Sequence, residues 1–428
     1  MSEAFRAPPG THDVLFPDSA RWEAVIATFA SLAHRAGYGL VVNPIFEDER
    51  VFVRGIGAGS DVASKEMYRF EDRGARRLAL RPEGTASVVR AFVQHRPPAP
   101  WKAWYVTPAF RYERPQAGRY RQHHQIGVEA IGSGDPDLDT EVIALAWQFY
   151  VDVGLGGVNL RIGSMGDATC RPAFERALRS WLDANMSKLC NEHGVKAMAN
   201  PLRVLDCKSE ECRSATESAP SISEALCPGC AEHFKRVREG LDALEVPYVC
   251  DPRLVRGFDY YTRTTFELSS PYLDAAQNGV GGGGRYDGLV EALGGPPSPA
   301  VGFGIGIERL LLACEAEGSP ARAARLVDVF VVDVVGGESA RRWTHELRLA
   351  GIGADRAFDG RSLKAQMRLA DRSGAEIAVI VGPEEKAAGK AAIRRLRGGG
   401  GDATIQELVD TATLVERVSV LLGDISVR

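Results

Sequence analysis

Two β-rich runs separated by a short polar loop constrain the fold of this chain more than any other feature. The runs are WKAWYVTPAFRYE at 101–113 and HHQIGVEAIG at 123–132, and the loop between them is RPQAGRYRQ. Runs of aromatic and β-branched residues on either side of a loop with Pro and Gly are typical of two paired strands. The segment therefore predicts a long antiparallel hairpin.

Four arginines gather on this hairpin: Arg111, Arg114, Arg119 and Arg121. Guanidinium groups stay charged and match phosphate oxygens with two parallel hydrogen bonds. Paired strands can aim several such groups into one pocket, so the hairpin is a candidate phosphate-binding site. The alternative, from the loop alone, is a solvated arginine-rich turn without a ligand.

The composition is that of an ordinary globular protein, with 45% hydrophobic and 25% charged residues in a chain of 428. No apolar stretch reaches the roughly 18 residues of a membrane span, and the first residues lack the apolar run of a signal peptide. We expect a cytoplasmic protein with no membrane partner, whose 8 cysteines are reduced thiols or metal ligands. The net charge of −4 argues against indiscriminate nucleic-acid binding but permits local basic surfaces.

Apolar periodicity predicts the coarse organisation of the chain. The first part has a helix ending at Gly37, a strand at 40–45, a helix at about 137–151, a helical Cys-bearing segment to about Tyr248, a strand at 262–270, a Gly-rich turn at Gly281–Gly284 and a strand at 300–307. Pro44 cannot donate to a sheet ladder, so it confines its strand to an edge or an interface. Beyond Pro320, strands and helices alternate, which predicts a small α/β domain.

Several separate segments resemble the motifs of histidyl-tRNA synthetases, which are class II aminoacyl-tRNA synthetases. The hairpin at Phe110–Gly132 resembles the second class II signature in its histidyl form. The other matching segments are LRPEGT at Leu80–Thr85, LVRGFDYYTR at Leu254–Arg263, GGRYDGL at Gly283–Leu289, the third class II signature AVGFGIGIERL at Ala300–Leu310, and Val42–Gly57, which resembles the first signature. The resemblance covers nearly the whole chain.

The resemblance implies an α+β fold. Residues 1–325 would form a class II antiparallel-sheet catalytic domain with a helical insertion at about 168–250, and residues 326–428 an α/β anticodon-binding domain. It further implies a homodimer, because the first signature forms the dimer interface in such enzymes. The expected activity is that of a histidine–tRNA ligase. Such an enzyme joins ATP and L-histidine into histidyl-adenylate and then transfers the histidine to histidine tRNA.

The family's ATP-binding residues can be carried over one at a time. Arg111 would hold the α-phosphate of ATP opposite Arg256, and these two are the expected catalytic residues. Arg309 would hold the γ-phosphate, with Mg²⁺ accompanying the nucleotide. The remaining ATP-binding positions are Glu113, Arg119, Arg121 and His123. His123 stands where the family usually has Phe, and an imidazole can also stack on adenine.

The expected histidine-binding residues come from four of the motifs. Glu83 and Thr85 would bind the α-amino group, and Gln125 would orient the amino acid next to Arg111. Glu129 and Tyr261 would bracket the imidazole ring. Tyr260 and Tyr286 complete the set, although ordinary packing on a sheet is the competing interpretation for these tyrosines.

Gly302, Gly304 and Gly306 alternate within an apolar strand. They lack the G-x-G-x-x-G spacing of a dinucleotide-binding loop. Their alternation indicates a strand whose backbone approaches adenosine closely.

Four cysteines form two short-spaced pairs inside the expected insertion, Cys207 with Cys212 and Cys227 with Cys230. Four thiolates suit a tetrahedral structural zinc site, and a small helical insertion would gain stability from the metal. The competing interpretation is four unrelated thiols.

Two features leave alternatives open. In the C-terminal domain, Lys364, Arg368 and Arg372 fall on one helical face, which suits either tRNA or solvent. The synthetase core is also shared by a histidine-sensing regulatory paralogue of ATP phosphoribosyltransferase. Such paralogues typically lose the catalytic arginines and the C-terminal domain, whereas this chain has Arg111, Arg256 and Arg309 and an α/β tail. A general RNA-binding module would not explain the RPEGT and tyrosine motifs.

Overall fold

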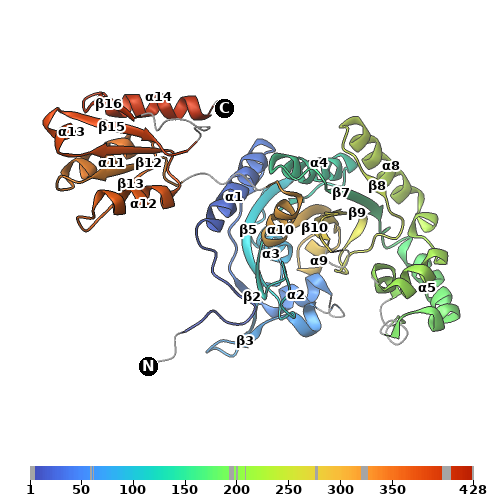
Figure 1. Cartoon of the computed structure of the whole chain (residues 1–428). Coiled ribbons are helices and arrows are strands. Elements are labelled where there is room, and N and C mark those ends of the chain that lie inside the picture. Colours follow the sequence, from blue (N-terminus) through green and yellow to red (C-terminus); the bar gives the residue numbers. More distant parts are fainter. Residues whose placement is uncertain are drawn as a thin grey trace. The chain divides into compact units, whose positions relative to one another are not determined.

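The computed structural model describes residues 5–57, 60, 62–191, 197–198, 201–207, 209–274, 278–319, 326–397 and 406–426. The chain divides into two compact units, Met1–Arg322 and Ala323–Arg428 (Figure 1). Among the described residues, no helix is long and apolar enough to cross a membrane.

The first unit is built on an eight-stranded, largely antiparallel sheet with the order β1-β5-β6-β11-β10-β9-β7-β8. The strands are β1 (Gly39–Leu40), β5 (Trp101–Phe110), β6 (Gln122–Ile131), β7 (Asn159–Ser164), β8 (Val249–Cys250), β9 (Thr262–Ser269), β10 (Gly279–Arg285) and β11 (Ala300–Gly306). The predicted hairpin is confirmed, because β5 and β6 pair without a break from Trp101 opposite Ile131 to Phe110 opposite Gln122. Its long strands place the hairpin loop beyond the edge of the neighbouring strand β11.

Successive side chains of the central strands point to opposite faces of the sheet and so pack into two separate cores. On one face, Ala130 and Val301 join the main core with helices α1 (Asp18–Arg35), α4 (Pro136–Asp152), α8 (Pro228–Ala243) and α10 (Ile307–Glu317). On the other face, Ile131 and Ala300 pack with α3 (Thr85–His95) and α9 (Leu289–Ala292). Next to α3 lie α2 (Glu49–Ile56), the π-helical turn η1 (Val62–Glu66) and a small sheet of β2 (Phe46–Asp48), β3 (Arg69–Glu71) and β4 (Arg77–Leu80).

A helical segment between β7 and β8 has a small core of its own. It contains α5 (Arg171–Asn185), α7 (Glu210–Ala215) and the 3₁₀ turns η2 (Met186–Lys188), η3 (Pro201–Asp206), η4 (Thr216–Ser218) and η5 (Ile222–Ala225), and α8 leads back to the sheet. Phe174, Leu178 and Leu182 of α5 pack there against Val204 and Ile222. The green segment in Figure 1 is this insertion, which projects beyond the β7 side of the sheet.

The second unit has a five-stranded sheet with the order β13-β12-β14-β15-β16. Its elements are β12 (Val329–Asp333), α11 (Glu338–Leu349), β13 (Ala354–Arg356), α12 (Leu363–Ser373), β14 (Ile377–Val381), α13 (Pro383–Ala387), β15 (Lys390–Arg395), β16 (Gln406–Asp410) and α14 (Leu414–Ser426). The first three strands are parallel and alternate with helices, as predicted. The antiparallel strands β15 and β16 were not anticipated.

Two local predictions were wrong for identifiable reasons. The strand expected at 40–45 is interrupted between β1 and β2, because Pro44 has no N–H with which to continue a ladder. Gly281–Gly284, expected to be a turn, forms most of the central strand β10. A side chain at Gly283 would place its Cβ 2.0 Å from the carbonyl oxygen of Gly302, and one at Gly281 would place it 2.6 Å from the hydroxyl of Tyr150. The glycines therefore allow close strand packing that no other residue permits.

We predict that Gly283→Ala destabilises the first unit by about 3 kcal/mol or more, because the added methyl has no space in the sheet. The matched control is Gly288→Ala, where a Cβ would have no neighbour within 4 Å. Denaturant unfolding of both variants checks this, and equal midpoints would contradict the packing argument.

Candidate active site

A cavity of about 260 Å³ opens where the hairpin loop meets β10, β11 and α10. Charged side chains dominate its wall, with the arginines Arg111, Arg119, Arg256 and Arg309 and the glutamates Glu113, Glu267 and Glu308. The other lining residues are Gly118, Tyr120, His123, Gln125, Gly279, Val280, Gly281, Gly282, Gly304 and Gly306. The predicted motifs thus converge from segments distant in sequence.

Arg111 lies at the end of β5 and is held from two sides. Its Nε donates to the carbonyl oxygen of Pro82 at 2.9 Å, and its guanidinium lies 5.6 Å from the centre of the Phe258 ring. Its Nη1 is 3.8 Å from a carboxylate oxygen of Glu113. These contacts leave much of the fork directed at the cavity.

Arg256 is fixed by a carboxylate that the motif analysis did not single out. Its Nη1 donates to Glu267 Oε2 at 2.9 Å, and Glu267 also pairs with Arg161. The glycine strand makes room for this arginine, because a Cβ on Gly282 would lie 2.9 Å from both terminal nitrogens of Arg256. Glu267 lies in strand β9. A charged residue is common in a strand whose side chains alternate between buried and exposed faces, so the sequence alone does not single out Glu267.

Arg309 lies in the first turn of α10, and its Nη1 donates to the carbonyl oxygen of Gly279 at 2.7 Å. Burial and the neighbouring charge of Arg119 lower the pKa of Arg309. Mutual repulsion of this kind makes the positive cluster unfavourable without an anion.

Two of these arginines have buried nitrogens without a hydrogen-bond partner among the described residues. They are Nε of Arg256 and Nη2 of Arg309. Leaving a buried cationic donor unpaired is costly, and an anion in the cavity would remove that cost. The arrangement therefore suits a ligand with several negatively charged oxygens.

The floor of the cavity is backbone rather than side chain. Gly304 and Gly306 of β11 and Gly281 of β10 line it, and their lack of side chains lets a flat ligand approach the sheet. His123 stands at the side, where burial lowers its pKa to about 3. The imidazole of His123 is therefore neutral at physiological pH and offers a flat face for stacking.

Further along β6, on the same face of the sheet as Gln125, lies a buried carboxyl group, Glu129. Its Oε1 accepts the hydroxyl of Thr85 at 2.7 Å, and its Oε2 accepts the hydroxyl of Tyr286. Burial raises the pKa of Glu129 to about 8, so the group is protonated at pH 7. Tyr105, which the motifs did not indicate, also lies close enough to Glu129 to influence its pKa.

Glu83 and Gln125 fix the turn that leads into α3. The two carboxylate oxygens of Glu83 accept the backbone N–H groups of Thr85 at 2.6 Å and Ala86 at 2.8 Å. Gln125 accepts the N–H of Gly84 at 3.2 Å and also lines the cavity. The LRPEGT loop is thereby tied to both the helix and the sheet.

The three expected tyrosines form one aromatic group. The rings of Tyr260 and Tyr261 have centroids 4.6 Å apart, and those of Tyr260 and Tyr286 are 5.6 Å apart. Tyr261 also lies under the guanidinium of Arg256, at 5.9 Å from its ring centre. The group therefore connects the arginine cavity to Glu129.

Two hairpin arginines lie outside the cavity wall. Arg121 stacks on the ring of Tyr112 at 4.0 Å and donates from Nε to the carbonyl oxygen of Glu113, while Arg114 is exposed. Arg121 thus holds the hairpin loop in this structure, and its expected place among the ATP-binding residues stays a prediction. Arg119 and Glu113 line the cavity, joined by a 3.3 Å ion pair.

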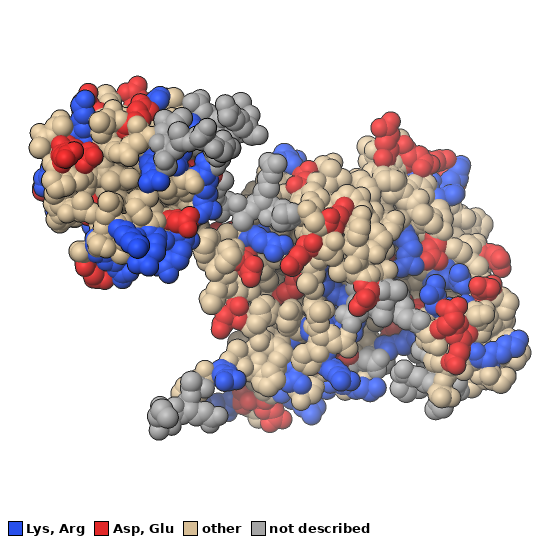
Figure 2. All heavy atoms as spheres, viewed as in Figure 1, with Lys and Arg blue, Asp and Glu red and all other residues tan. Residues whose placement is uncertain are grey.

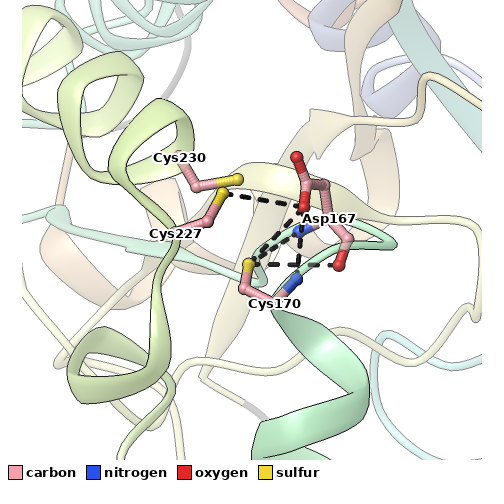
Figure 3. A group of neighbouring side chains, drawn as sticks. All are labelled: Asp167, Cys170, Cys227 and Cys230. Carbon is pink, nitrogen blue, oxygen red and sulfur yellow. Dashed lines mark hydrogen bonds between the residues drawn. The ribbon is translucent and has the colours of Figure 1, made fainter.

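The four-cysteine zinc site predicted from sequence is wrong in its composition. Cys207 and Cys212 group with Cys190, whereas Cys227 and Cys230 group with Cys170 and Asp167. Figure 3 shows the second group, at the point where α5 and α8 approach each other. The spacing in sequence correctly paired Cys207 with Cys212 and Cys227 with Cys230. It did not reveal that each pair lies beside further metal-ligating residues of its own.

In the second unit, the predicted basic face is present on α12. Lys364, Arg368 and Arg372 are exposed, together with the neighbouring Arg361, while Gln366 and Ala370 of the same helix are buried. Figure 2 shows blue side chains gathered on this side of the unit.

Comparison with known proteins agrees with this geometry. The family model of the histidyl-tRNA synthetase matches residues 10–310, and that of an anticodon-binding domain matches residues 328–420. The histidine–tRNA ligase of Moorella thermoacetica is 48% identical over 414 residues, covering 96% of each chain. That of Rhodococcus erythropolis is 47% identical over 432 residues, covering 99% of each. The solved structure of the apo histidyl-tRNA synthetase from S. aureus superimposes with a TM-score of 0.78 at 35% identity, covering 97% of this chain and 100% of that one.

An antiparallel sheet with arginines around its cavity, joined to an anticodon-binding domain, defines a class II aminoacyl-tRNA synthetase. The extent of the matches is more specific. The chain belongs to the histidyl-tRNA synthetase family. This confirms the resemblance seen in the motifs, the α+β fold class and the expected histidine–tRNA ligase activity.

We predict that Glu267→Gln slows ATP–pyrophosphate exchange by about 10- to 100-fold, because a loosened Arg256 meets its anion in the wrong position. The control is Asp152→Asn, which removes a surface partner of Arg35 at 3.6 Å. Equal exchange rates in the two variants would show that Glu267 does not position Arg256.

Proposed function

We propose that this chain forms histidyl-adenylate in the cavity around Arg111, Arg256 and Arg309 and then transfers histidine to the 3′ end of histidine tRNA, releasing AMP. The observation that carries this proposal is the convergence of arginines with unpaired buried donors on one cavity, next to a buried carboxyl group suited to an imidazole.

The arginines have distinct positions relative to ATP. We assign Arg111 and Arg256 to the α-phosphate, because they line the cavity from β5 and from the segment before β9. Arg309, beside Arg119, takes the γ-phosphate, and His123 stacks on adenine above Gly304 and Gly306. Fixed cations stabilise charge that develops at the phosphorus without reorganising during the reaction.

Mg²⁺ is expected to enter with ATP, since carboxylate and phosphate oxygens are the ligands it prefers. Glu113 fits as its protein partner because its carboxylate lines the cavity and makes only long contacts with Arg111 and Arg119. The ion would neutralise phosphate charge.

Histidine recognition is assigned to the residues around Glu129. An ionised carboxylate has about four acceptor sites. When Glu129 passes its proton to the imidazole, the Thr85 and Tyr286 hydroxyls therefore leave capacity for the imidazole N–H. Tyr261 closes the other side of the ring. Glu83 is preorganised by two backbone amides and can accept the substrate's α-amino group beside Thr85, while Gln125 orients the carboxylate towards Arg111.

Two anions react in this step, so positioning is the main task of the protein. The histidine carboxylate is already ionised and attacks the α-phosphorus in line, with pyrophosphate leaving, and no general base is needed. In the second step the terminal ribose hydroxyl of the tRNA attacks the activated carbonyl, and AMP leaves.

We also propose a homodimer and a tRNA-binding role for the second unit. Val42, Ile45 and Phe46 of the first class II signature are exposed apolar residues, as is Leu40 just before it. Leu40 and Val42 line a groove beside α3. Burial against a second copy would remove this surface from water. The basic face of α12 suits the phosphates of the tRNA, whose unstacked anticodon bases a neighbouring surface can read.

ATP–pyrophosphate exchange with each amino acid in turn tests the function. We expect exchange with histidine alone, and an Arg256→Ala variant should slow it by about 100- to 1,000-fold because a transition-state partner is lost. Circular dichroism and sedimentation should show the same folded assembly for both proteins. Tight histidine binding without any exchange would instead indicate a histidine sensor.

The affinity for histidine should depend on pH through Glu129. The carboxyl group, with its pKa raised to about 8, and the imidazole, with a pKa of about 6.5, must share one proton in the complex. Below pH ~6.5 the free imidazole is protonated, so binding must release a proton. Above pH ~8 the free Glu129 is ionised, so binding must take a proton up. The affinity for histidine therefore falls about tenfold per pH unit on either side. Calorimetric titration from pH 5.5 to 9 measures this.

The Glu129→Gln variant separates Glu129 from other titrating groups. Its amide does not ionise, so the fall in affinity that begins near pH 8 should disappear relative to the original chain. An unchanged alkaline limb in the variant would assign that limb to another group.

A further inference from the structure

A compact group of metal-ligating side chains lies at the base of the insertion, away from the arginine cavity. Asp167 and Cys170 occupy the turn between β7 and α5. Cys227 is the residue just before α8, and Cys230 lies in the first turn of α8. One potential ligand atom from each residue lies within 4.8 Å of all the others. In Figure 3 the carboxylate and the sulfur atoms of Cys170, Cys227 and Cys230 gather in one place from two separate elements.

The separations match a shared ion better than a covalent bond. The Sγ atoms of Cys170 and Cys227 lie 3.6 and 3.9 Å from Asp167 Oδ1. Zn–S bonds of about 2.3 Å and Zn–O bonds of about 2.1 Å give tetrahedral edges of roughly 3.6 to 3.8 Å. A disulfide would instead require sulfur atoms about 2.05 Å apart, and the three cysteines of the group are free thiols here.

We propose that one zinc ion binds to Asp167, Cys170, Cys227 and Cys230 and fastens the insertion to the catalytic sheet. Three soft thiolates favour zinc over magnesium or calcium, and one carboxylate completes a four-ligand site. This ligand set differs from the four cysteines that sequence spacing predicted.

The surroundings of the group resemble the outer shell of a metal site. The N–H of Asp167 donates to Cys170 Sγ at 3.3 Å, and the N–H of Thr169 donates to Asp167 Oδ1 at 2.9 Å. Arg263 reaches Asp167 Oδ2 at 3.5 Å. Such donors orient ligands and offset the negative charge that three thiolates and a carboxylate bring together.

The position suggests what the ion does. The insertion begins just after β7, near Asp167, and Cys227 stands just before α8, which leads back to the sheet. A shared ion therefore closes the segment at its base. The adjoining backbone is tied to the tyrosine motif, since Arg263 exchanges backbone hydrogen bonds with Met165 and Gly166 and Arg171 donates to the carbonyl oxygen of Tyr261. The ion therefore has a structural role that extends to the edge of the histidine pocket.

Cys190, Cys207 and Cys212 form a separate group inside the insertion. The described residues supply three ligands there, one fewer than a tetrahedral zinc site requires.

Zinc content of the full-length, tag-free protein, measured by plasma mass spectrometry after dialysis, tests the proposal. Cys227→Ser combined with Cys230→Ser should contain about one zinc ion per chain less than the original protein. Cys250→Ser is the matched control, because Cys250 is exposed and belongs to neither group. Equal zinc content in all three proteins, or iron in place of zinc, would overturn the proposal.

A second measurement uses the unmodified chain and so does not depend on the folding of a variant. Alkylation mapped by mass spectrometry should modify Cys250 quickly and spare Cys170, Cys227 and Cys230 until a chelator is added. A disulfide between Cys227 and Cys230, or alkylation that a chelator does not accelerate, would contradict a bound ion.

Discussion

The buried carboxyl group of Glu129 is the constraint on which the arrangement of the catalytic sheet depends. A Cβ on Gly302 would lie 1.9 Å from Glu129 Oε2, so β11 can pair with β6 at this point only because it has no side chain there. The opposite neighbour, β10, approaches β11 through Gly283 for the same reason. The glycine-rich strands therefore create the space in which Thr85, Tyr286 and Glu129 meet.

A second requirement is that the arginines remain in place without their ligand. Each is held by a partner from another element, Arg111 by Pro82, Arg256 by Glu267 and Arg309 by Gly279. Two buried donors nevertheless remain without a partner in the described residues. These unpaired donors lower the stability of the folded protein, but they leave the arginines already oriented when ATP binds. This is the usual origin of electrostatic preorganisation.

Sequence predicted those features that depend on local pattern. The hairpin follows from its β-rich runs, and the alternating first half of the C-terminal unit follows from periodicity. Arg111, Arg256 and Arg309 were found from motifs, and the structure brings all three into one cavity. Their assignment to particular phosphates remains a prediction.

Features that depend on contacts between distant segments were missed. The glycine run at 281–284 has the composition of a turn, and only its neighbours Gly302 and Tyr150 explain why it is a strand. Glu267 and Tyr105 look like ordinary strand residues until Arg256 and Glu129 are placed beside them. Arg121 fits a phosphate-binding loop by composition, but its stacking on Tyr112 depends on how the loop folds.

The central claim is that one site places an imidazole on Glu129 and a phosphate between Arg111 and Arg256. A crystal structure of the full chain with a non-hydrolysable histidyl-adenylate analogue tests it most directly. We expect an imidazole N–H within hydrogen-bond distance of Glu129, the group that replaces the α-phosphate between the two arginines, and adenine beside His123. An analogue bound with its imidazole away from Glu129, or with neither arginine in contact, would contradict the account.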